Sequence, residues 1–108
     1  MNRLISFLGI VRKSGKLSLG CDCVKQSIID RKAQLIVVAC DASERSLLKF
    51  KNLARIYNVD ILLIKESMED LKLILGKKVG IISVNEEGLA RKIIELEETV
   101  YDEKISST

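Results

Sequence analysis

Three short, largely apolar runs separated by helix-patterned segments constrain the fold of this chain more than any other feature. The runs cover residues 35–39, 59–64 and 79–84, and each is rich in β-branched side chains. Such runs are typical of strands that are covered on both faces of a sheet. Strands that alternate with helices predict a central sheet between helical layers. We therefore expect an α/β fold, a three-layer α/β/α sandwich with a central mixed sheet of about four strands.

Residues with known preferences for helix ends separate the expected helices. Gly15 and Gly76 follow apolar helical stretches, and we expect them to end helices because glycine adopts the left-handed conformation without a Cβ clash. Gly20 is expected to open a helix, and Asp41 with Glu44 resembles a capping box for the next helix.

The helical spacing of apolar residues predicts which side chains turn inward. A short extended stretch, residues 17–19, separates the first two helices. Ser67 is expected to cap a short helix, and Asn85 to begin the last one. The expected inward-facing residues are Leu4, Leu8 and Val11; Val24 and Ile28, with Ile29 beside them; Leu47, Phe50, Ala54 and Tyr57; Met68, Leu71 and Leu75; and Leu89, Ile93, Leu96 and Val100.

The length and composition predict one domain. The chain has 108 residues, 47% of them apolar and 31% charged, and it contains no proline. A chain of this size buries roughly 65% of its unfolded surface, which is enough for a core without disulfides or metals. No glycine-rich linker or internal repeat divides it. We expect a single domain over residues 1–101 and a frayed tail over residues 102–108.

The composition also excludes several kinds of catalytic and metal site. There is no histidine, so serine–histidine and cysteine–histidine nucleophiles and histidine-containing zinc sites are impossible. Cys21, Cys23 and Cys40 are an odd number, and the Cys-x-Cys spacing is not that of zinc or redox motifs. We interpret them as reduced thiols.

The remaining motifs do not indicate an enzyme. Gly9 and Gly15 lack the spacing of a phosphate-binding loop. Asp22, Asp41 and Asp60 fall near predicted strand ends, where active sites of α/β folds gather, but each is equally suited to a helix cap or a turn. We therefore predict a non-enzymatic protein with no cofactor and no metal, and keep a small carboxylate enzyme as an alternative.

No segment of the sequence predicts membrane insertion or export. There is no run of about 18 apolar residues, and the amphipathic N-terminal pattern differs from that of a signal peptide. We expect a cytoplasmic protein that has no membrane partner.

Charge is distributed unevenly along the chain. Residues 1–85 contain 15 Lys and Arg against 8 Asp and Glu, a net charge of +7, whereas residues 86–108 contain 3 against 7, a net charge of −4. A basic body of this kind suits a polyanionic partner, although charges interspersed on helices are also typical of ordinary solvated faces.

Two glycine-flanked basic loops and one helix start are the candidate binding elements. The loops are residues 12–16 and 76–80, and the helix start is residues 20–26. Glycines allow a ligand to approach the backbone, lysines neutralise phosphates, and the N-terminus of a helix favours anions. Helix termination, solubility and simple capping are the structural alternatives.

Five segments resemble one known family. They are residues 13–20, 32–43, 57–59, 75–77 and 84–90, which occur in one order between about residues 4 and 96. Together they resemble the kink-turn-binding ribosomal proteins of the L7Ae/L30e superfamily, most closely its bacterial YlxQ-like branch. The resemblance implies an α/β/α sandwich that binds folded RNA.

The resemblance also implies which residues contact RNA. The segment at residues 20–26 would enter the RNA, the loop at 77–81 would contact a looped-out nucleotide, and the turn at 13–16 would supply lysines. We expect these three segments to form one surface at one end of the sheet. The candidate RNA-binding residues are Lys13, Lys16, Gly20, Cys21, Asp22, Cys23, Lys25, Gln26, Lys77, Lys78, Val79 and Gly80.

The chain departs from the family pattern at the start of the second helix. Kink-turn binders carry asparagine or lysine and then glutamate or glutamine where this chain has Asp22 and Cys23, and Gln26 replaces a lysine. The expected partner is structured RNA, including ribosomal RNA or the ribosome, but not DNA, and the free protein is expected to be a monomer. The alternative is a protein-interaction module that keeps the fold and has lost specific RNA readout.

Overall fold

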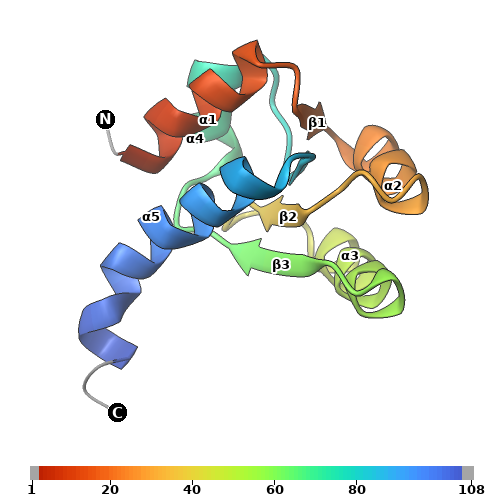
Figure 1. Cartoon of the computed structure of the whole chain (residues 1–108). Coiled ribbons are helices and arrows are strands. Elements are labelled where there is room, and N and C mark those ends of the chain that lie inside the picture. The colour runs from red at the N-terminus through yellow and green to blue at the C-terminus, as the bar shows by residue number, and fades with distance from the viewer. Residues whose placement is uncertain (1–2, 106–108) are drawn as a thin grey trace.

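The computed structural model describes the backbone of residues 3–105 and the side chains of residues 3–97. Within this part of the chain, five helices and four strands follow one another (Figure 1). The elements are α1 (Arg3–Lys13), β1 (Leu17–Leu19), α2 (Cys21–Ile29), β2 (Leu35–Val38), α3 (Glu44–Tyr57), β3 (Asp60–Leu63), α4 (Met68–Leu75), β4 (Ile81–Val84) and α5 (Glu87–Ile105).

The strands form one mixed sheet in the order β1-β4-β2-β3. Strand β3 is parallel to β2, and β4 is antiparallel to both of its neighbours. Helices α2 and α3 cover one face of the sheet, and α1, α4 and α5 cover the other (Figure 1). The predicted three-layer sandwich with a four-stranded mixed sheet is confirmed.

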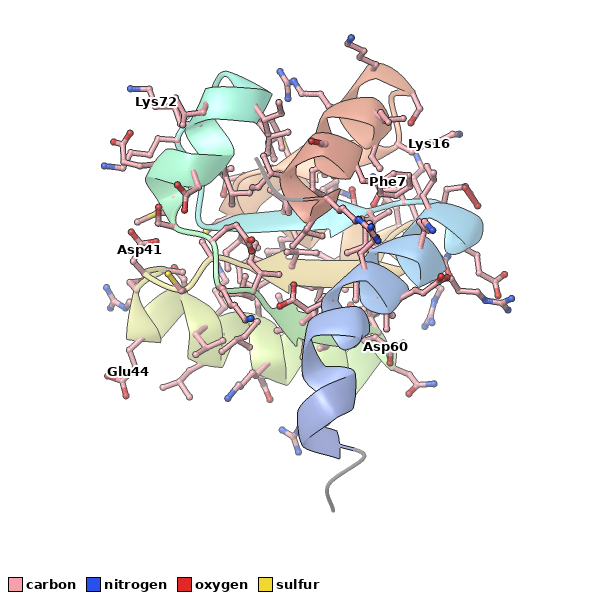
Figure 2. All side chains as sticks on the ribbon, turned by 90° about the vertical axis from the view of Figure 1, so that its left-hand side faces the viewer. Phe7, Lys16, Asp41, Glu44, Asp60 and Lys72 are labelled. Atoms are coloured by element: carbon pink, nitrogen blue, oxygen red, sulfur yellow. The ribbon has the colours of Figure 1, made fainter. Side chains whose placement is uncertain are left out.

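The strand directions define two ends of the sheet. Strands β1, β2 and β3 run in the same direction, so their carboxyl ends share one end, at which α2, α3 and α4 begin. Asp41 and Glu44 lie at this end, whereas Lys16 and Asp60 lie at the other (Figure 2). We call the first the helix-start end and the second the Lys16 end.

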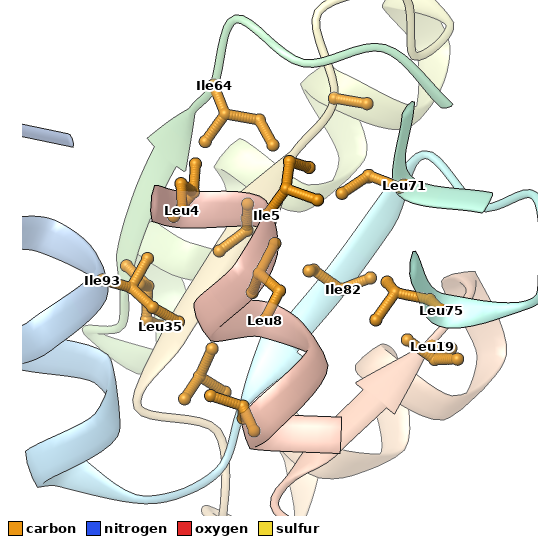
Figure 3. Packing of buried hydrophobic residues seen from close by; sticks show 14 of the residues in the cluster. Leu4, Ile5, Leu8, Leu19, Leu35, Ile64, Leu71, Leu75, Ile82 and Ile93 are labelled. Carbon is orange, nitrogen blue, oxygen red and sulfur yellow. The ribbon is translucent and has the colours of Figure 1, made fainter. Parts of the chain in front are cut away.

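Alternate residues of the central strands face the two helical layers. Leu35 and Val37 of β2 belong to the larger hydrophobic cluster, beneath α1, α4 and α5, and Ile36 and Val38 belong to the smaller one, beneath α2 and α3. All four residues of β2 are buried, as predicted for a strand that is covered on both faces. The labelled side chains of Figure 3 that belong to the larger cluster are Leu4, Ile5, Leu8, Leu19, Leu35, Ile64, Leu71, Leu75, Ile82 and Ile93.

The predicted ends of α4 are confirmed. The hydroxyl of Ser67 accepts a hydrogen bond from the Asp70 amide, and the Asp70 carboxylate accepts one from the Ser67 amide, which completes a capping box. Gly76 ends the helix in the left-handed conformation, with φ 77°. Local sequence signals were sufficient here because both partners of the cap lie within one helical turn.

The predicted capping box of α3 is wrong. Ser43 caps this helix, since its Oγ accepts from the Ser46 amide at 3.1 Å. Asp41 Oδ1 instead accepts from the amide of Met68 at 2.8 Å and joins the end of β2 to the start of α4. The last helix likewise begins later than predicted from Asn85, at Glu87, and the carboxylate of Glu86 accepts from the first amides of α5.

Two burial predictions also require correction. The run at residues 59–64 was expected to be covered on both faces, but β3 is an edge strand with partly exposed side chains, and Leu63 is 44% exposed. In α2, the buried face is Val24, Ser27 and Ile28, whereas Ile29 is 43% exposed. About 100° of rotation per residue places Ser27, three positions after Val24, on the inner face.

The C-terminal predictions fall largely outside the described side chains. Helix α5 extends to Ile105, so the expected tail over residues 102–108 and the inward position of Val100 stay predictions. Within the described residues, none of the helices combines the length and the apolar character needed to cross a membrane.

Helix α5 carries a buried carboxylate. The residue Glu97 is 3% exposed, and its Oε1 has no hydrogen-bond partner among the described residues. Burial, assisted by the nearby negative charge of Glu66, raises the pKa of Glu97 above its ordinary value of 4.5, and Lys65 partly opposes this shift. The charged form is therefore disfavoured in the folded protein.

We predict that Glu97→Gln stabilises the protein at neutral pH. The pKa of Glu97 is higher in the folded than in the unfolded protein. The loss of folding free energy from the charged form is therefore absent below the unfolded-state pKa and grows as pH rises from the unfolded-state pKa to the folded-state pKa. The variant should gain about 1 kcal/mol, or about 4 °C in Tm, at pH 7, and nothing near pH 4. Thermal unfolding followed by circular dichroism at several pH values measures this difference.

The matched control is Glu95→Gln, since Glu95 lies on the same helix with a side chain that is 70% exposed. It should change the free energy of unfolding by less than about 0.5 kcal/mol. An unchanged or lower stability of Glu97→Gln at pH 7 would show that the buried charge is not destabilising.

Candidate nucleic-acid interface

The start of α2 and the loop between α4 and β4 meet at the helix-start end. The Gly20 amide donates to the Ile81 carbonyl at 2.9 Å, which holds the entry to α2 against the first residue of β4. Gly20 has φ 90° and ψ 160°, a backbone conformation that is essentially restricted to glycine. A Cβ at Gly20 would lie 3.9 Å from Cγ1 of Val79, so the two segments are direct neighbours.

The first turn of α2 presents backbone donors. Gly20 has no side chain and forms no side-chain cap, and the Val24 amide donates to the Gly20 carbonyl at 3.0 Å. The amides of residues 21–23 have no hydrogen-bond partner among the described residues. The side chains of Cys21, Asp22 and Cys23 are exposed. Amides at the N-terminus of a helix and the positive end of its dipole favour an anion.

The loop between α4 and β4 combines lysines with a glycine that packs closely against neighbouring residues. Lys77 is exposed, and Lys78 Nζ lies 3.4 Å from Glu69 Oε1 in an exposed ion pair. Val79 is buried, with an exposed fraction of 6%, although it was predicted to begin the strand, which starts at Ile81. A Cβ at Gly80 would come within 3.1 Å of Ala42 Cβ and Met68 Sδ, so any larger residue here would require these neighbours to shift.

The polar side chains of α2 are only partly available. Lys25 is exposed, but the Gln26 side chain donates to Asp30 Oδ1 at 2.9 Å and points along its own helix. Cys21 Sγ lies 4.0 Å from Ser46 Oγ, which places the start of α3 beside the start of α2.

The third predicted segment lies elsewhere. Lys16 comes before β1, and its carbonyl accepts from the Asn85 amide at 2.8 Å, at the Lys16 end of the sheet. Lys13 ends α1 and lines a hollow beside Ile74. The expectation that residues 13–16, 20–26 and 77–81 form one surface at one end is therefore wrong for the first segment, because β1 separates it from Gly20.

The helix-start end is balanced in charge rather than basic. Lys25 and Lys77 are exposed there, but Asp22 occupies the first turn of α2, and Glu69 is paired with Lys78. The basic net charge of residues 1–85 is therefore not concentrated at this end. Backbone amides are the main feature that favours an anion at this surface.

The candidate catalytic and metal-binding residues are dispersed. Asp41 and Asp60 lie at opposite ends of the parallel pair β2–β3, and Asp41 is occupied by the Met68 amide (Figure 2). The three cysteines are free and exposed. Among the described residues, no group of three or more Cys, Asp or Glu side chains could hold a metal ion.

Sequence reasoning missed a polar cluster at the Lys16 end. Ser18, Ser27 and Asn85 are joined there by hydrogen bonds beneath Arg31 and Lys32. The available signal was Ser27, which lies between the apolar residues of the inner face of α2. Its partners lie in other elements, and only the fold brings them together.

We predict that Gly20→Ala destabilises the protein by about 1–3 kcal/mol, because alanine must adopt a glycine-only conformation. Circular dichroism during urea unfolding measures the loss. The adjacent variant Cys21→Ala, at an exposed position with ordinary helical geometry, should change stability by less than about 0.5 kcal/mol. Equal stability of the two variants would contradict the role assigned to Gly20.

Comparisons with known proteins agree with this architecture. The chain is 29% identical over 94 residues to the "RNA-binding protein YlxQ" of Enterococcus faecium, which covers 87% of this chain and 90% of that protein. A solved structure, described as a protein with unknown function from Bacillus halodurans C, superposes with a TM-score of 0.85 at 20% identity, over 91% of this chain and 99% of that one. A sequence profile of the ribosomal protein L7Ae/L30e/S12e/Gadd45 family matches residues 3–94, and the chain therefore belongs to this family.

Proposed function

We propose that this protein is a non-enzymatic binder of structured RNA, of the kink-turn or ribosomal kind, and that RNA binds at the helix-start end. The observation that carries the proposal is the contact between the start of α2 and the α4–β4 loop, through the Gly20 to Ile81 hydrogen bond. Membership of the family and the name of the Enterococcus relative support RNA binding.

In the proposed complex, each segment has a separate physical role. The amides that open α2 donate to a phosphate or to a base edge, and Lys25 and Lys77 neutralise phosphates. Lys78 also contributes, since an exposed ion pair such as Lys78–Glu69 contributes only about 0–1 kcal/mol and is readily exchanged for a phosphate.

The side chains at the start of α2 set the expected specificity. The Asp22 carboxylate repels phosphate, and the Cys23 thiol is too weak a donor and acceptor to read a guanine edge. We therefore expect the protein to recognise the shape and backbone of folded RNA more strongly than its base sequence.

We predict that Asp22→Asn binds RNA about fivefold more tightly than the wild type at low salt, because it removes one negative charge beside the phosphate-binding amides and keeps the side-chain shape. Gel-shift titrations with kink-turn, stem-loop and duplex RNA measure the change. The control is Asp30→Asn, at the other end of the same helix. Equal effects of the two substitutions, or weaker binding by Asp22→Asn, would contradict the proposed surface.

We predict that Lys77→Ala combined with Lys78→Ala weakens RNA binding and flattens its salt dependence. Three lysine contacts should give the wild type a slope of about −2 to −3 in log affinity against log salt, and loss of two should bring it close to −1. Arg12→Ala with Lys13→Ala removes the same charge from the end of α1 and should leave the slope nearly unchanged. A larger effect of the Arg12 and Lys13 pair would place the RNA elsewhere.

A second candidate function follows from the charge balance at the helix-start end. Asp22 and the exposed thiols of Cys21 and Cys23 also suit a protein partner whose contacting surface is not strongly acidic. The domain would then act as a protein-interaction module. Affinity capture from an extract, with and without nuclease, separates the two functions. A partner retained after RNA removal supports the module, and its loss supports RNA binding.

A further inference from the structure

A hollow of about 570 Å³ lies at the Lys16 end, on the side of the sheet that α2 covers. Lys16, Arg31 and Lys32 line its rim, and Ser18, Ser27 and Asn85 line its floor. It is separated from the proposed RNA surface by the length of β4, which is four residues or about 13 Å.

The floor of the hollow is a connected set of polar side chains. Asn85 Nδ2 donates to Ser18 Oγ at 2.9 Å, and the hydroxyls of Ser18 and Ser27 lie 2.7 Å apart. The hydroxyl of Ser83, which is fully buried, donates to Asn85 Oδ1 at 3.0 Å. The Asn85 amide nitrogen points toward Ser18.

Counting hydrogens shows that the floor has donors to spare. The bond between the Ser18 and Ser27 hydroxyls uses one of their two hydrogens, whichever residue donates. The second hydrogen on Asn85 Nδ2 also has no acceptor among the described residues. The floor thus offers two unused donor hydrogens, which together with the cations of the rim favour an oxyanion over a cation.

The rim adds positive charge. Lys16, Arg31 and Lys32 form no ion pair with any described carboxylate. Asp30, Glu86 and Asp60 lie toward the same end of the sheet, but none of them lines the hollow. The lining carries three cations and no carboxylate, which favours an anion there.

Arg31 is held in place at this rim. It has φ 59°, in the left-handed region, where a non-glycine residue is uncommon, and its guanidinium lies 5.6 Å from the centroid of the Tyr57 ring. The amides of Lys32 and Ala33 donate to the Ser27 carbonyl at 2.9 and 3.1 Å, so the turn that carries the two cations is tied to the floor residue.

We propose that this hollow binds the phosphate group of a phosphate ester. Arg31, Lys16 and Lys32 would pair with the phosphate, and the hydroxyl and amide donors of the floor would bind its inner oxygens. The volume lies within the roughly 300–1,000 Å³ range of small-ligand pockets and leaves space for a sugar beside the phosphate. A free sugar phosphate and the backbone of RNA both provide this chemistry.

The test is a titration of the ¹⁵N-labelled full chain, followed by amide chemical shifts at constant ionic strength. The probes are inorganic phosphate, ribose 5-phosphate and a single-stranded RNA oligonucleotide without terminal phosphates. We expect saturating shifts at Ser18, Ser27, Lys32 and the Asn85 side chain, and binding about tenfold weaker for Lys16→Gln with Arg31→Gln. The same spectra show whether the variant is folded.

The matched control is Lys77→Gln with Lys78→Gln, which removes two positive charges from the other end and should leave these shifts unchanged. If ribose 5-phosphate saturates the shifts and the RNA does not, the hollow binds the phosphate of a free small molecule. If both saturate the shifts, the hollow also binds the phosphates of nucleic acid. Shifts that do not saturate, or that are equal in the Lys16 and Arg31 variant, overturn it. Ser27→Ala provides a second variant that leaves the rim charges in place and should also weaken binding.

Discussion

The antiparallel pairing of β4 with β1 and β2 is the constraint on which the rest of the molecule depends. β4 lies between the two strands and is buried on both faces, so its register fixes what surrounds each of its ends. At its start, the Ile81 carbonyl accepts from the Gly20 amide, and Gly80 of the preceding loop packs against Ala42 and Met68. At its end, Asn85 binds Lys16 and holds the floor of the cationic hollow. Both candidate sites are therefore consequences of one strand pairing.

The two sites differ in how they favour an anion. At the helix-start end, unoccupied backbone amides and the dipole of α2 provide the attraction, and Asp22 reduces it. At the Lys16 end, side-chain cations surround a floor of hydroxyl and amide donors. Backbone amides suit an extended polyanion that lies across a surface, whereas a concave cluster of cations suits a single phosphate group. The separation of the two kinds of site explains why the basic charge of the chain does not gather on the predicted RNA surface.

The sequence was sufficient wherever the deciding contact was local. The cap of α4 at Ser67, its end at Gly76 and the doubly buried β2 were all predictable, because each depends on residues within one turn or one strand. The failures involve distant partners. Asp41 does not cap α3 because its carboxylate is taken by Met68, 27 residues away. The exposure of β3 depends on its place at the edge of the sheet, which no residue within the strand encodes.

The same limit applied to the candidate site. The expectation that residues 20–26 and 77–81 share one surface agrees with the contact between Gly20 and Ile81, but the direction of β1 carries residues 13–16 to the other end. Ultraviolet crosslinking of the protein to RNA in cell extract, with identification of the crosslinked peptides, shows directly where RNA binds. Crosslinks are expected within residues 20–25 and 77–81. Crosslinks confined to Lys16, Arg31 and Lys32, or none at all, would contradict RNA binding at the helix-start end.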